Sequence, residues 1–435
     1  MPSASLRLAV IGAGAAGLAA ARELRREGHA PVVFERAAAV GGTWLYTPPA
    51  SAADPLGAAA THSSLYASLR TNLPRETMGF LDFPFSAAAP GSADPRRFPG
   101  HEEVLRYLEA FARRFDLHRL VRFETEVVSV RRDPGGSWAV TSRKLGEKGS
   151  GEEEVYDAVV VCNGHYTEPR IAVIPGVDAW PGQQMHSHNY RVPEPFLDQV
   201  VIIIGASASA FDISRDISNI AKEVHIADRS VPASTCEKQP GYDNLWLHSM
   251  DNGNVVFQDG SSIKADVIMH CTGYLYDFPF LGNDSTITVD DNCVDPLYKH
   301  VFPPEVAPQL SFIGLQWKVI PFPLFELQSK WVAGVLSGRI ELPSKEEMME
   351  DVKAFYAKLE TCGWPKRYTH NFSNYQFEYG DWLAEQCGHP PIEEWRKLMY
   401  AANARNKVAR PESYRDKWDD DHLVADAHED FNKYL

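Results

Sequence analysis

No two cysteines lie close together in this sequence of 435 residues. Its six cysteines lie apart with no CxxC pair, and no histidine cluster has metal-ligand spacing, so neither a redox disulfide nor a metal centre is predicted. Long lysine or arginine runs are also absent, and the formal net charge is −15. Nucleic acids and anionic membranes bind basic surfaces, so neither is an expected partner. These absences favour an acidic cytoplasmic enzyme with reduced thiols.

Apolar runs of membrane-spanning length are missing as well. A transmembrane helix needs about 20 consecutive apolar residues, and the sequence has no such run. The chain begins almost directly with residues 6–11, LRLAVI, without the charged region of a signal peptide. This short run is typical of a buried parallel strand. We therefore expect no membrane anchor, and the composition leaves the oligomeric state open.

A glycine-rich turn follows this strand. Gly12 permits a tight turn, Gly14 lets the backbone approach a pyrophosphate, and Gly17 lets the next helix pack on the strand. That helix begins with Ala15 and Ala16, whose free N–H groups suit an anion.

A second strand, expected over residues 31–34, ends at Glu35, 23 residues after Gly12. An acid at this position can accept hydrogen bonds from an adenosine ribose. Small residues also serve simply to pack a helix on a strand, so the glycines alone are weak evidence. The full register of strand, turn, helix, strand and acid predicts a dinucleotide site.

The same pattern recurs from residue 200. An apolar strand ends at Gly205, and the next strand ends at Asp228, again 23 residues later. Asp228 would favour the bare hydroxyls of NADH, whereas Arg229 can pair with the ribose 2′-phosphate of NADPH. We favour NADPH. Because each copy supports the other, the repeat predicts two dinucleotide-binding halves.

The remaining elements are expected at ranges with helical or strand periodicity. Loops are expected over residues 51–99, and residues 145–154 are interpreted as the charged tip of a hairpin. Helices are expected over residues 15–27, 101–117 and 345–359 and from Phe325, and strands over 121–131, 138–142, 156–162 and 310–314. A helical tail is expected to pack on the first domain.

The segment WPGQQMHSHNY, residues 180–190, lies between the two repeats. By themselves its two histidines are more often satisfied core or surface residues than functional ones. Two further short motifs have equally plain interpretations. Gly41-Gly42 can form an ordinary turn, and Asn72, in LRTNLPRE, is more often a turn residue than a catalytic one.

Taken together, the chain resembles a plant-type flavin-containing monooxygenase, close to the glucosinolate S-oxygenase-like group. The family fingerprint FxGxxxHxxxY is similar to Trp180, Gly182, His186 and Tyr190, with Trp in place of Phe. A Baeyer–Villiger enzyme would carry Trp-Pro where this chain has Tyr190-Arg191. The turn at Gly41 resembles the family's GGTW, and the residues from Cys271 to Tyr274 resemble its ATGY linker.

The resemblance implies an α/β fold with two Rossmann-like dinucleotide-binding domains, the smaller NADPH domain inserted in the larger FAD domain. The expected boundaries are 1–175 and 276–435 for FAD and 176–275 for NADPH. FAD would be held by Gly12, Gly14, Ala15, Ala16, Gly17, Glu35, Gly42, Thr43 and Trp44. NADPH would be held by Gly205, Ser207, Ser209, Ala210 and Arg229, with Gly182, His186, Tyr190, Thr272 and Gly273 around its crevice.

The chemistry implied by the resemblance belongs to the cofactors. NADPH reduces FAD, oxygen adds to flavin C4a as a hydroperoxide, and a soft nucleophile takes the outer oxygen. Asn72 falls where the family places an asparagine that faces the reactive edge of the flavin. S-oxygenation of a small-molecule thioether is expected, and N-oxygenation of an amine and an uncoupled NADPH oxidase releasing hydrogen peroxide are the alternatives.

Two other classes share parts of this pattern. A flavin disulfide reductase would need a redox cysteine pair, which the chain lacks. A non-enzymatic NADPH sensor would hold no reducible flavin. Three features of the second half depart from the family pattern. Ser207 and Ala210 replace glycines, and Asp228 replaces a small polar residue. The segment over residues 250–255 is shorter than in the family.

Overall fold

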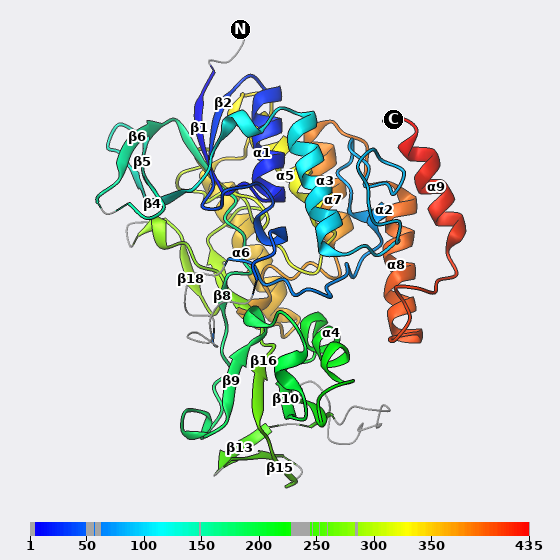
Figure 1. Ribbon diagram of the computed structural model, residues 1–435. Helices are drawn as coiled ribbons and strands as arrows, with labels where there is room; N and C mark the ends of the chain where they lie inside the picture. The colour runs from blue at the N-terminus through cyan, green and yellow to red at the C-terminus, as the bar shows by residue number, and fades with distance from the viewer. Residues whose placement is uncertain are drawn as a thin grey trace. The chain divides into compact units, whose positions relative to one another are not determined.

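The structure is a computed structural model that describes residues 5–48, 56, 62–147, 149–227, 244–245, 247–251, 253–258, 260–282 and 286–434 (Figure 1). The chain divides into two compact units. Unit 1 comprises Met1–Trp44, Arg70–Gly164 and Tyr276–Leu435, and unit 2 comprises Leu45–Leu69 and His165–Leu275. Unit 2 therefore consists of two segments inserted in unit 1.

A five-stranded parallel sheet in the order β20-β7-β1-β2-β3 is the middle layer of unit 1. Alternate side chains of β1 enter two different cores: Leu8 and Val10 pack with the helices, and Ala9 and Ile11 with an antiparallel layer. Both faces of the strand are thus buried, which explains its uninterrupted apolar sequence. The strands are β1 (Arg7–Ile11), β2 (Ala30–Phe34), β3 (Val121–Arg122), β7 (Ala158–Val161) and β20 (Leu310–Phe312).

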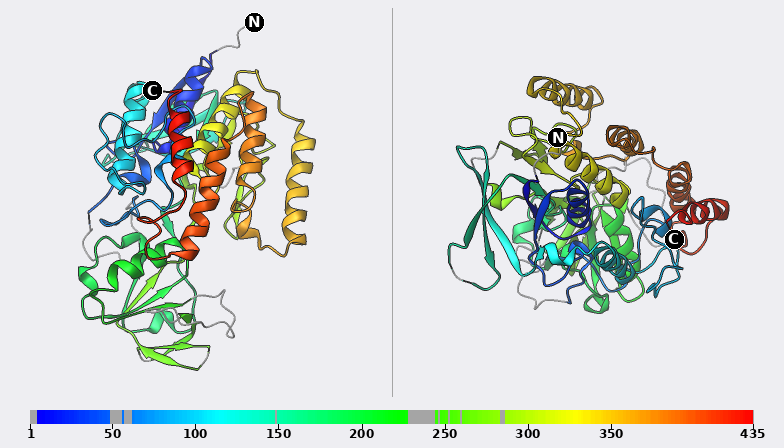
Figure 2. Two further views of the ribbon diagram at one scale, coloured as in Figure 1. Left: turned by 90° about the vertical axis from the view of Figure 1, so that its right-hand side faces the viewer. Right: turned by 90° about the horizontal axis from the view of Figure 1, so that it is seen from above.

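Helices cover one face of this sheet, where α1 packs on α5 and α5 packs on α7 (Figure 1). Farther along the chain, α8 and α9 lie side by side (Figure 2). The helices of unit 1 are α1 (Ala15–Arg26), α2 (Arg75–Met78), α3 (His101–Arg114), α5 (Pro321–Leu336), α6 (Lys345–Thr361), α7 (Gln376–Cys387), α8 (Glu394–Ala409) and α9 (Asp421–Phe431).

An antiparallel sheet covers the other face, since Val130, Trp138 and Tyr156 share a core with Ala9 and Ile11 of β1. Its strands are β4 (Thr125–Arg132), β5 (Trp138–Lys144) and β6 (Glu152–Tyr156), and a separate hairpin joins β18 (Thr288–Asp290) to β19 (Cys293–Asp295). Short 3-10 helices occupy Gly42–Trp44, His118–Leu120, Pro279–Leu281 and Lys366–Tyr368 in unit 1, and Val177–Ala179, Ser187–Asn189 and Glu194–Phe196 in unit 2.

Unit 2 repeats this layering around a parallel sheet in the order β12-β11-β10-β16-β9. Val201 and Ile203 of β10 pack with the helix α4 (Ala208–Ile217), whereas Ile202 and Ile204 pack with β14. The strands are β9 (Gln183–His186), β10 (Val200–Ile204), β11 (Glu223–Ala227), β12 (Asn244–Leu245), β13 (Leu247–Asp251), β14 (Asn254–Phe257), β15 (Ser262–Lys264) and β16 (Val267–His270), with β8 (Glu168–Pro169) paired to β17 (Tyr274–Leu275). Two Rossmann-like halves, one inserted in the other, confirm the predicted fold class.

Residues 45–48 and 62–69 lie within the predicted first domain but belong to unit 2. The guanidinium of Arg191 donates hydrogen bonds to the carbonyl oxygens of Thr47 and Ser63, each at 2.7 Å. The ring of Tyr66 lies edge-on to that of Tyr190, with centroids 5.4 Å apart. A buried arginine directly after Tyr190 of the fingerprint therefore attaches these residues to the rest of unit 2.

Several sequence-based element boundaries were wrong. The single strand expected over residues 121–131 is two strands in different sheets, because Glu124 takes a left-handed conformation with φ 52° and ends β3. Likewise, Asp157 separates β6 from β7 within the strand expected over residues 156–162. The last residues of the expected charged tip belong to β6. Helix α5 begins at Pro321 rather than Phe325, since proline suits the first helical position. Helix α3 ends at Arg114.

Among the described residues, no helix is both long and apolar enough to cross a membrane. No group of potential metal ligands occurs in that part of the chain either.

A matched pair of substitutions tests how α1 packs in unit 1 and how α4 packs in unit 2. A Cβ on Gly17 would stand 1.8 Å from the carbonyl oxygen of Gly12, so Gly17→Ala is expected to destabilise the protein by about 3 kcal/mol or more. Ala210→Gly at the equivalent position removes only a buried methyl group and should cost about 1–2 kcal/mol. Thermal unfolding followed by circular dichroism measures both, and equal losses would contradict the difference in packing.

Candidate functional site

The turn after β1 forms the centre of the candidate site in unit 1. Gly12 has φ 102°, and its N–H donates to the carbonyl oxygen of Phe34 at 2.8 Å. A Cβ on Gly12 would stand 2.5 Å from the carbonyl oxygen of Cys162, so only glycine fits here. Ala15 and Ala16 open α1, whose first amides point out of this turn. Gly12 and Gly17 are thus required by the protein's own packing.

Glu35 lies where the sequence places it, at the end of β2 and 6% exposed. Its two carboxylate oxygens accept hydrogen bonds from the N–H groups of Ala13 at 2.7 Å and Ala37 at 2.8 Å. Burial raises the pKa of this carboxyl, and the two N–H donors oppose that shift. A carboxylate has about four lone-pair sites, so Glu35 keeps acceptor capacity for ribose hydroxyls.

The Gly42-Thr43-Trp44 turn lies directly against the glycine turn. The N–H of Gly41 donates to the carbonyl oxygen of Ala13 at 3.0 Å. A Cβ on Gly42 would stand 2.9 Å from the Cα of Gly14, whereas the nearest atom to a Cβ on Gly14 lies at 3.5 Å. Protein packing therefore requires glycine at Gly42 but not at Gly14, which agrees with the expected close approach of a pyrophosphate to Gly14.

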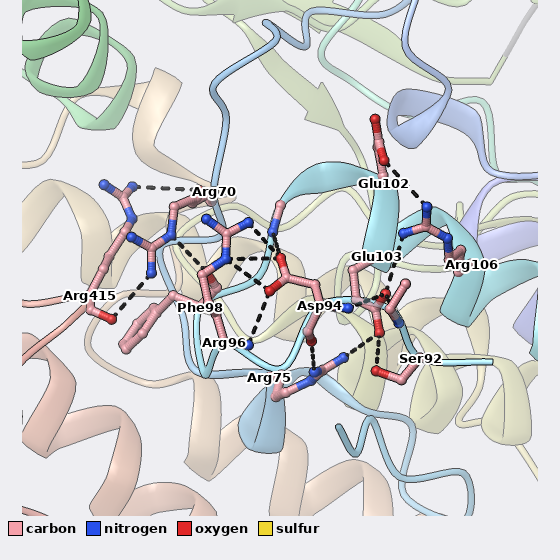
Figure 3. A network of polar contacts seen from close by, with 12 residues as sticks. Arg70, Arg75, Ser92, Asp94, Arg96, Phe98, Glu102, Glu103, Arg106 and Arg415 are labelled. Atoms are coloured by element: carbon pink, nitrogen blue, oxygen red, sulfur yellow. Dashed lines mark hydrogen bonds and ion pairs between the residues drawn. The ribbon is translucent and has the colours of Figure 1, made fainter. Parts of the chain in front are cut away.

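Asn72 is presented on an otherwise buried segment. Of residues 71–81, all of which the structure describes, only Asn72 is exposed. The N–H of Thr71 donates to the carbonyl oxygen of Pro99, and that of Arg75 donates to the carbonyl oxygen of Arg97. Arg75 also forms a buried ion pair with Glu103 at 2.8 Å (Figure 3). The fold thus holds a rigid backbone on either side of one free amide side chain.

Gln316 is a candidate site residue that the sequence did not single out. It follows β20 and is 2% exposed, yet neither its amide nitrogen nor its amide oxygen has a hydrogen-bond partner among the described residues. Nearby, a Cβ on Gly314 would contact the Cβ of Ala16 at 3.5 Å, which places this segment at the first turn of α1. A buried unsatisfied polar group costs about 1–3 kcal/mol, so Gln316 indicates a polar ligand at this edge of the sheet.

The turn after β10 repeats the geometry in unit 2. Gly205 has φ 109°, its N–H donates to the carbonyl oxygen of Ala227 at 2.8 Å, and its Cβ would stand 2.4 Å from the carbonyl oxygen of Cys271. Ser207 and Ser209 are exposed at the start of α4, whereas Ala210 is fully buried. Asp228 and Arg229 lie outside the described residues, so the choice of NADPH over NADH stays a prediction.

His186 of the fingerprint is fully buried in unit 2. Its Nδ1 accepts a hydrogen bond from the N–H of His188 at 3.0 Å, so its Nε2 carries the proton and donates to the carbonyl oxygen of Gly273, also at 3.0 Å. Burial, together with the neighbouring His188 and His270, lowers the pKa of His186 to about 3. The neutral ring joins the fingerprint to the linker through the carbonyl group of Gly273. Any effect of His186 on a bound cofactor would therefore be indirect, through the position of the linker backbone.

The other fingerprint residues are also packed inside unit 2. Tyr190 is 1% exposed and hydrogen-bonds through its hydroxyl to Asp216. The indole of Trp180 lies over Gly182, where a Cβ would stand 2.2 Å from the ring. Thr272 donates to the carbonyl oxygen of Arg170, and Gly273 has φ 83°. Binding roles for these residues stay predictions, and the structure favours positioning over direct contact for Tyr190.

The residues in each unit fit a dinucleotide. Each turn combines a glycine forced into positive φ, a following helix N-terminus and an adjacent parallel strand, which is the arrangement that binds a pyrophosphate. In unit 1, Glu35 provides an acceptor suited to ribose hydroxyls. The unpaired amide of Gln316 provides a donor and an acceptor suited to a flavin ring.

A comparison with protein families agrees with this geometry. Residues 5–235 and 246–393 match the model of a family described as flavin-binding monooxygenase-like. The flavin-containing monooxygenase FMO GS-OX-like 3 of Arabidopsis thaliana is 59% identical over 445 residues, which cover 100% of this chain and 98% of the relative.

Solved structures give the same result. The S-allyl-L-cysteine S-oxygenase from Allium sativum is 62% identical, with a TM-score of 0.93 and full coverage of both chains. Tmm from Pelagibacter sp. strain HTCC7211 is 28% identical, with a TM-score of 0.80, and the match covers 94% of this chain and 93% of that one.

Gln316→Leu tests the predicted ligand contact. Because leucine fills a similar volume without amide groups, the variant should fold normally but retain FAD about tenfold less tightly, as for one or two lost hydrogen bonds. Visible absorbance after equilibrium dialysis measures retention. Gln309→Leu, before the amino end of the same strand, is the control, and equal retention in both variants would remove Gln316 from the site.

Acid should destabilise unit 2 through its buried histidines. Burial lowers the pKa of His270 to about 4 and that of His186 to about 3, whereas an unfolded histidine titrates near about 6.5. Their stabilisation is therefore complete above about pH 6.5 and decreases as the pH falls towards these folded values, by up to about 1.4 kcal/mol per pH unit for each.

His270→Gln should flatten this dependence. Urea midpoints between pH 7 and pH 4.5 provide the measurement, and His422→Gln, at an exposed position of α9, serves as the control. An unchanged slope for His270→Gln would show that this buried ring does not drive the acid sensitivity.

Proposed function

The chain belongs to the flavin-binding monooxygenase-like family, and we propose that it uses FAD, NADPH and molecular oxygen to convert a small-molecule thioether to its sulfoxide. The observation that carries this proposal is the full-length likeness, at 62% identity, to a protein named S-allyl-L-cysteine S-oxygenase. In the balanced reaction, thioether, NADPH, a proton and O2 give sulfoxide, NADP+ and water. Bound FAD would supply the redox chemistry between NADPH and oxygen.

Residues of unit 1 bind and orient the FAD. The turn from Gly12 to Gly17 and the first amides of α1 bind its pyrophosphate. Glu35 accepts from its ribose, Gln316 hydrogen-bonds its ring, and the turn from Gly42 to Trp44 lies beside it. No protein nucleophile or metal ion is needed for this chemistry.

Residues of unit 2 hold the NADPH. Gly205, Ser207, Ser209 and Ala210 form its pyrophosphate turn, and Arg229 selects its 2′-phosphate. His186, whose pKa is lowered by burial so that the ring is neutral, fixes the linker at Gly273 through its Nε2. Thr272 fixes the same linker through the carbonyl oxygen of Arg170.

Asn72 is the catalytic residue in this proposal. Its side chain is exposed on a segment whose other residues, 71 and 73–81, are buried, so its amide is free to donate and accept hydrogen bonds at the reacting centre. Its role is to orient the substrate and oxidised nicotinamide, and to keep oxygen transfer faster than loss of hydrogen peroxide to water.

Substrate class is tested by measuring three quantities in one reaction: NADPH consumed, oxygenated product formed and hydrogen peroxide released. With S-allyl-L-cysteine or a methylthioalkyl compound, we expect close to one sulfoxide per NADPH and little peroxide. A tertiary amine of similar size should give mainly peroxide. Amine oxide as the main product would indicate an N-oxygenase, and peroxide equal to NADPH with every compound would indicate an oxidase.

Asn72→Ala tests the proposed catalytic residue. Loss of an orienting group at the reacting centre should reduce sulfoxide per NADPH by about tenfold, with peroxide making up the difference. Asn432→Ala, at an exposed position after α9, is the matched control. Unchanged coupling in Asn72→Ala would remove this residue from the mechanism.

A further inference from the structure

The backbone of the Asn72 segment is held by the C-terminal part of the chain. The carbonyl oxygen of Asn72 accepts a hydrogen bond from the Nδ2 of Asn403 on α8 at 3.1 Å. The preceding carbonyl, that of Thr71, accepts from the Nε of Arg415 at 2.9 Å. Two consecutive peptide groups next to the proposed catalytic side chain are therefore fixed by side chains more than 330 residues away in sequence.

A reciprocal contact strengthens this attachment. Arg415 reaches the carbonyl oxygen of Arg70 at 3.5 Å, and Arg70 donates to the carbonyl oxygen of Arg415 at 3.3 Å (Figure 3). Arg70 also forms an ion pair with Asp416 at 2.9 Å. The segment is thus joined to the chain after α8 in both directions.

The same helix holds the other side of Asn72. Arg396, 2% exposed on α8, donates to the carbonyl oxygens of Thr77 at 2.6 Å and Gly79 at 3.2 Å, at the end of α2. Arg396 and Asn403 are seven residues apart, so they lie two turns apart on one face of α8. One helix face therefore holds the backbone both at Asn72 and just beyond it.

Asn403 makes this contact at a cost in stability. It is 5% exposed, and its Oδ1 has no hydrogen-bond partner among the described residues. A buried unsatisfied acceptor costs about 1–3 kcal/mol, and asparagine is a poorer helix former than leucine, which branches at the same carbon. An apolar residue would suit the helix better, so the one bond from Asn403 to Asn72 indicates a role other than stability.

We propose that Asn403 is a positioning residue that fixes the backbone of Asn72 and thereby aims its amide at the reacting centre. This inference depends on the proposed function, in which Asn72 acts in oxygen transfer. Loss of the Nδ2 donor frees the Asn72 peptide to rotate, so the amide spends less time in the productive orientation, and a small misplacement of such a group is enough to lower the rate of transfer.

Asn403→Leu in the full-length holoenzyme tests the proposal. We expect sulfoxide per NADPH to fall about fivefold while the rate of flavin reduction changes less than about twofold, because only the transfer step needs the Asn72 amide. We also expect faster hydrogen–deuterium exchange in a peptide spanning residues 70–80, with or without FAD. The thermal midpoint should stay the same or rise, which a purely structural role would not produce.

Arg405→Leu is the matched control, at an exposed position of the same helix. This substitution keeps both the bond from Asn403 to Asn72 and the contacts of Arg415 with the segment. Normal coupling in this control supports a specific role of Asn403. Equal uncoupling in both variants, or unchanged coupling in Asn403→Leu, overturns it.

The double variant Asn72→Ala with Asn403→Leu separates this proposal from the proposed function. If Asn403 acts through Asn72, the double variant is no less coupled than Asn72→Ala alone, whereas additive losses overturn the positioning role. If Asn72→Ala alone couples normally, the catalytic role of Asn72 fails. The exchange measurement then still decides whether Asn403 fixes the segment.

Discussion

Both halves of the protein depend on one close approach between two backbones. In each unit the first glycine of the turn stands so near the end of a neighbouring strand that a Cβ would meet a cysteine carbonyl oxygen, at 2.5 Å for Gly12 and Cys162 and 2.4 Å for Gly205 and Cys271. In each unit the glycine N–H also closes on the end of the second strand. This three-strand junction brings a helix N-terminus and the sheet edge together, and the proposed cofactor contacts follow from it.

The halves differ where the sequence departs from glycine. Gly17 leaves no room for a methyl group beside Gly12, whereas Ala210 fits its methyl group into the core of unit 2. The first turn of α4 therefore tolerates a side chain that the first turn of α1 cannot. Even so, the layers are the same in both units, because each central strand is buried on one face by helices and on the other by an antiparallel sheet.

The parts of the fold that sequence could predict are those controlled by local pattern. The apolar strands β1 and β10, the start of α1 at Ala15 and the position of Glu35 after β2 were predicted correctly, because burial on both faces and the glycine turn leave a direct signature. The break at Glu124 was missed because a single left-handed residue has little compositional signal. Arg191 and Asn403 were missed as well, because their contacts are with residues distant in sequence. The unpaired amide of Gln316 was missed because burial without a partner is a property of the folded chain.

The attachment of the Asn72 segment to α8 bears on the order in which the protein folds during synthesis. Unit 2 takes most of its residues from one continuous range, His165–Leu275, and can assemble while the rest of the chain is still being made. The sheet of unit 1 cannot be completed until β20 has been synthesised. The backbone at Asn72 can form its hydrogen bonds with Asn403 and Arg415 only after those residues have left the ribosome. A partly made chain therefore lacks the contacts that hold the backbone at Thr71 and Asn72.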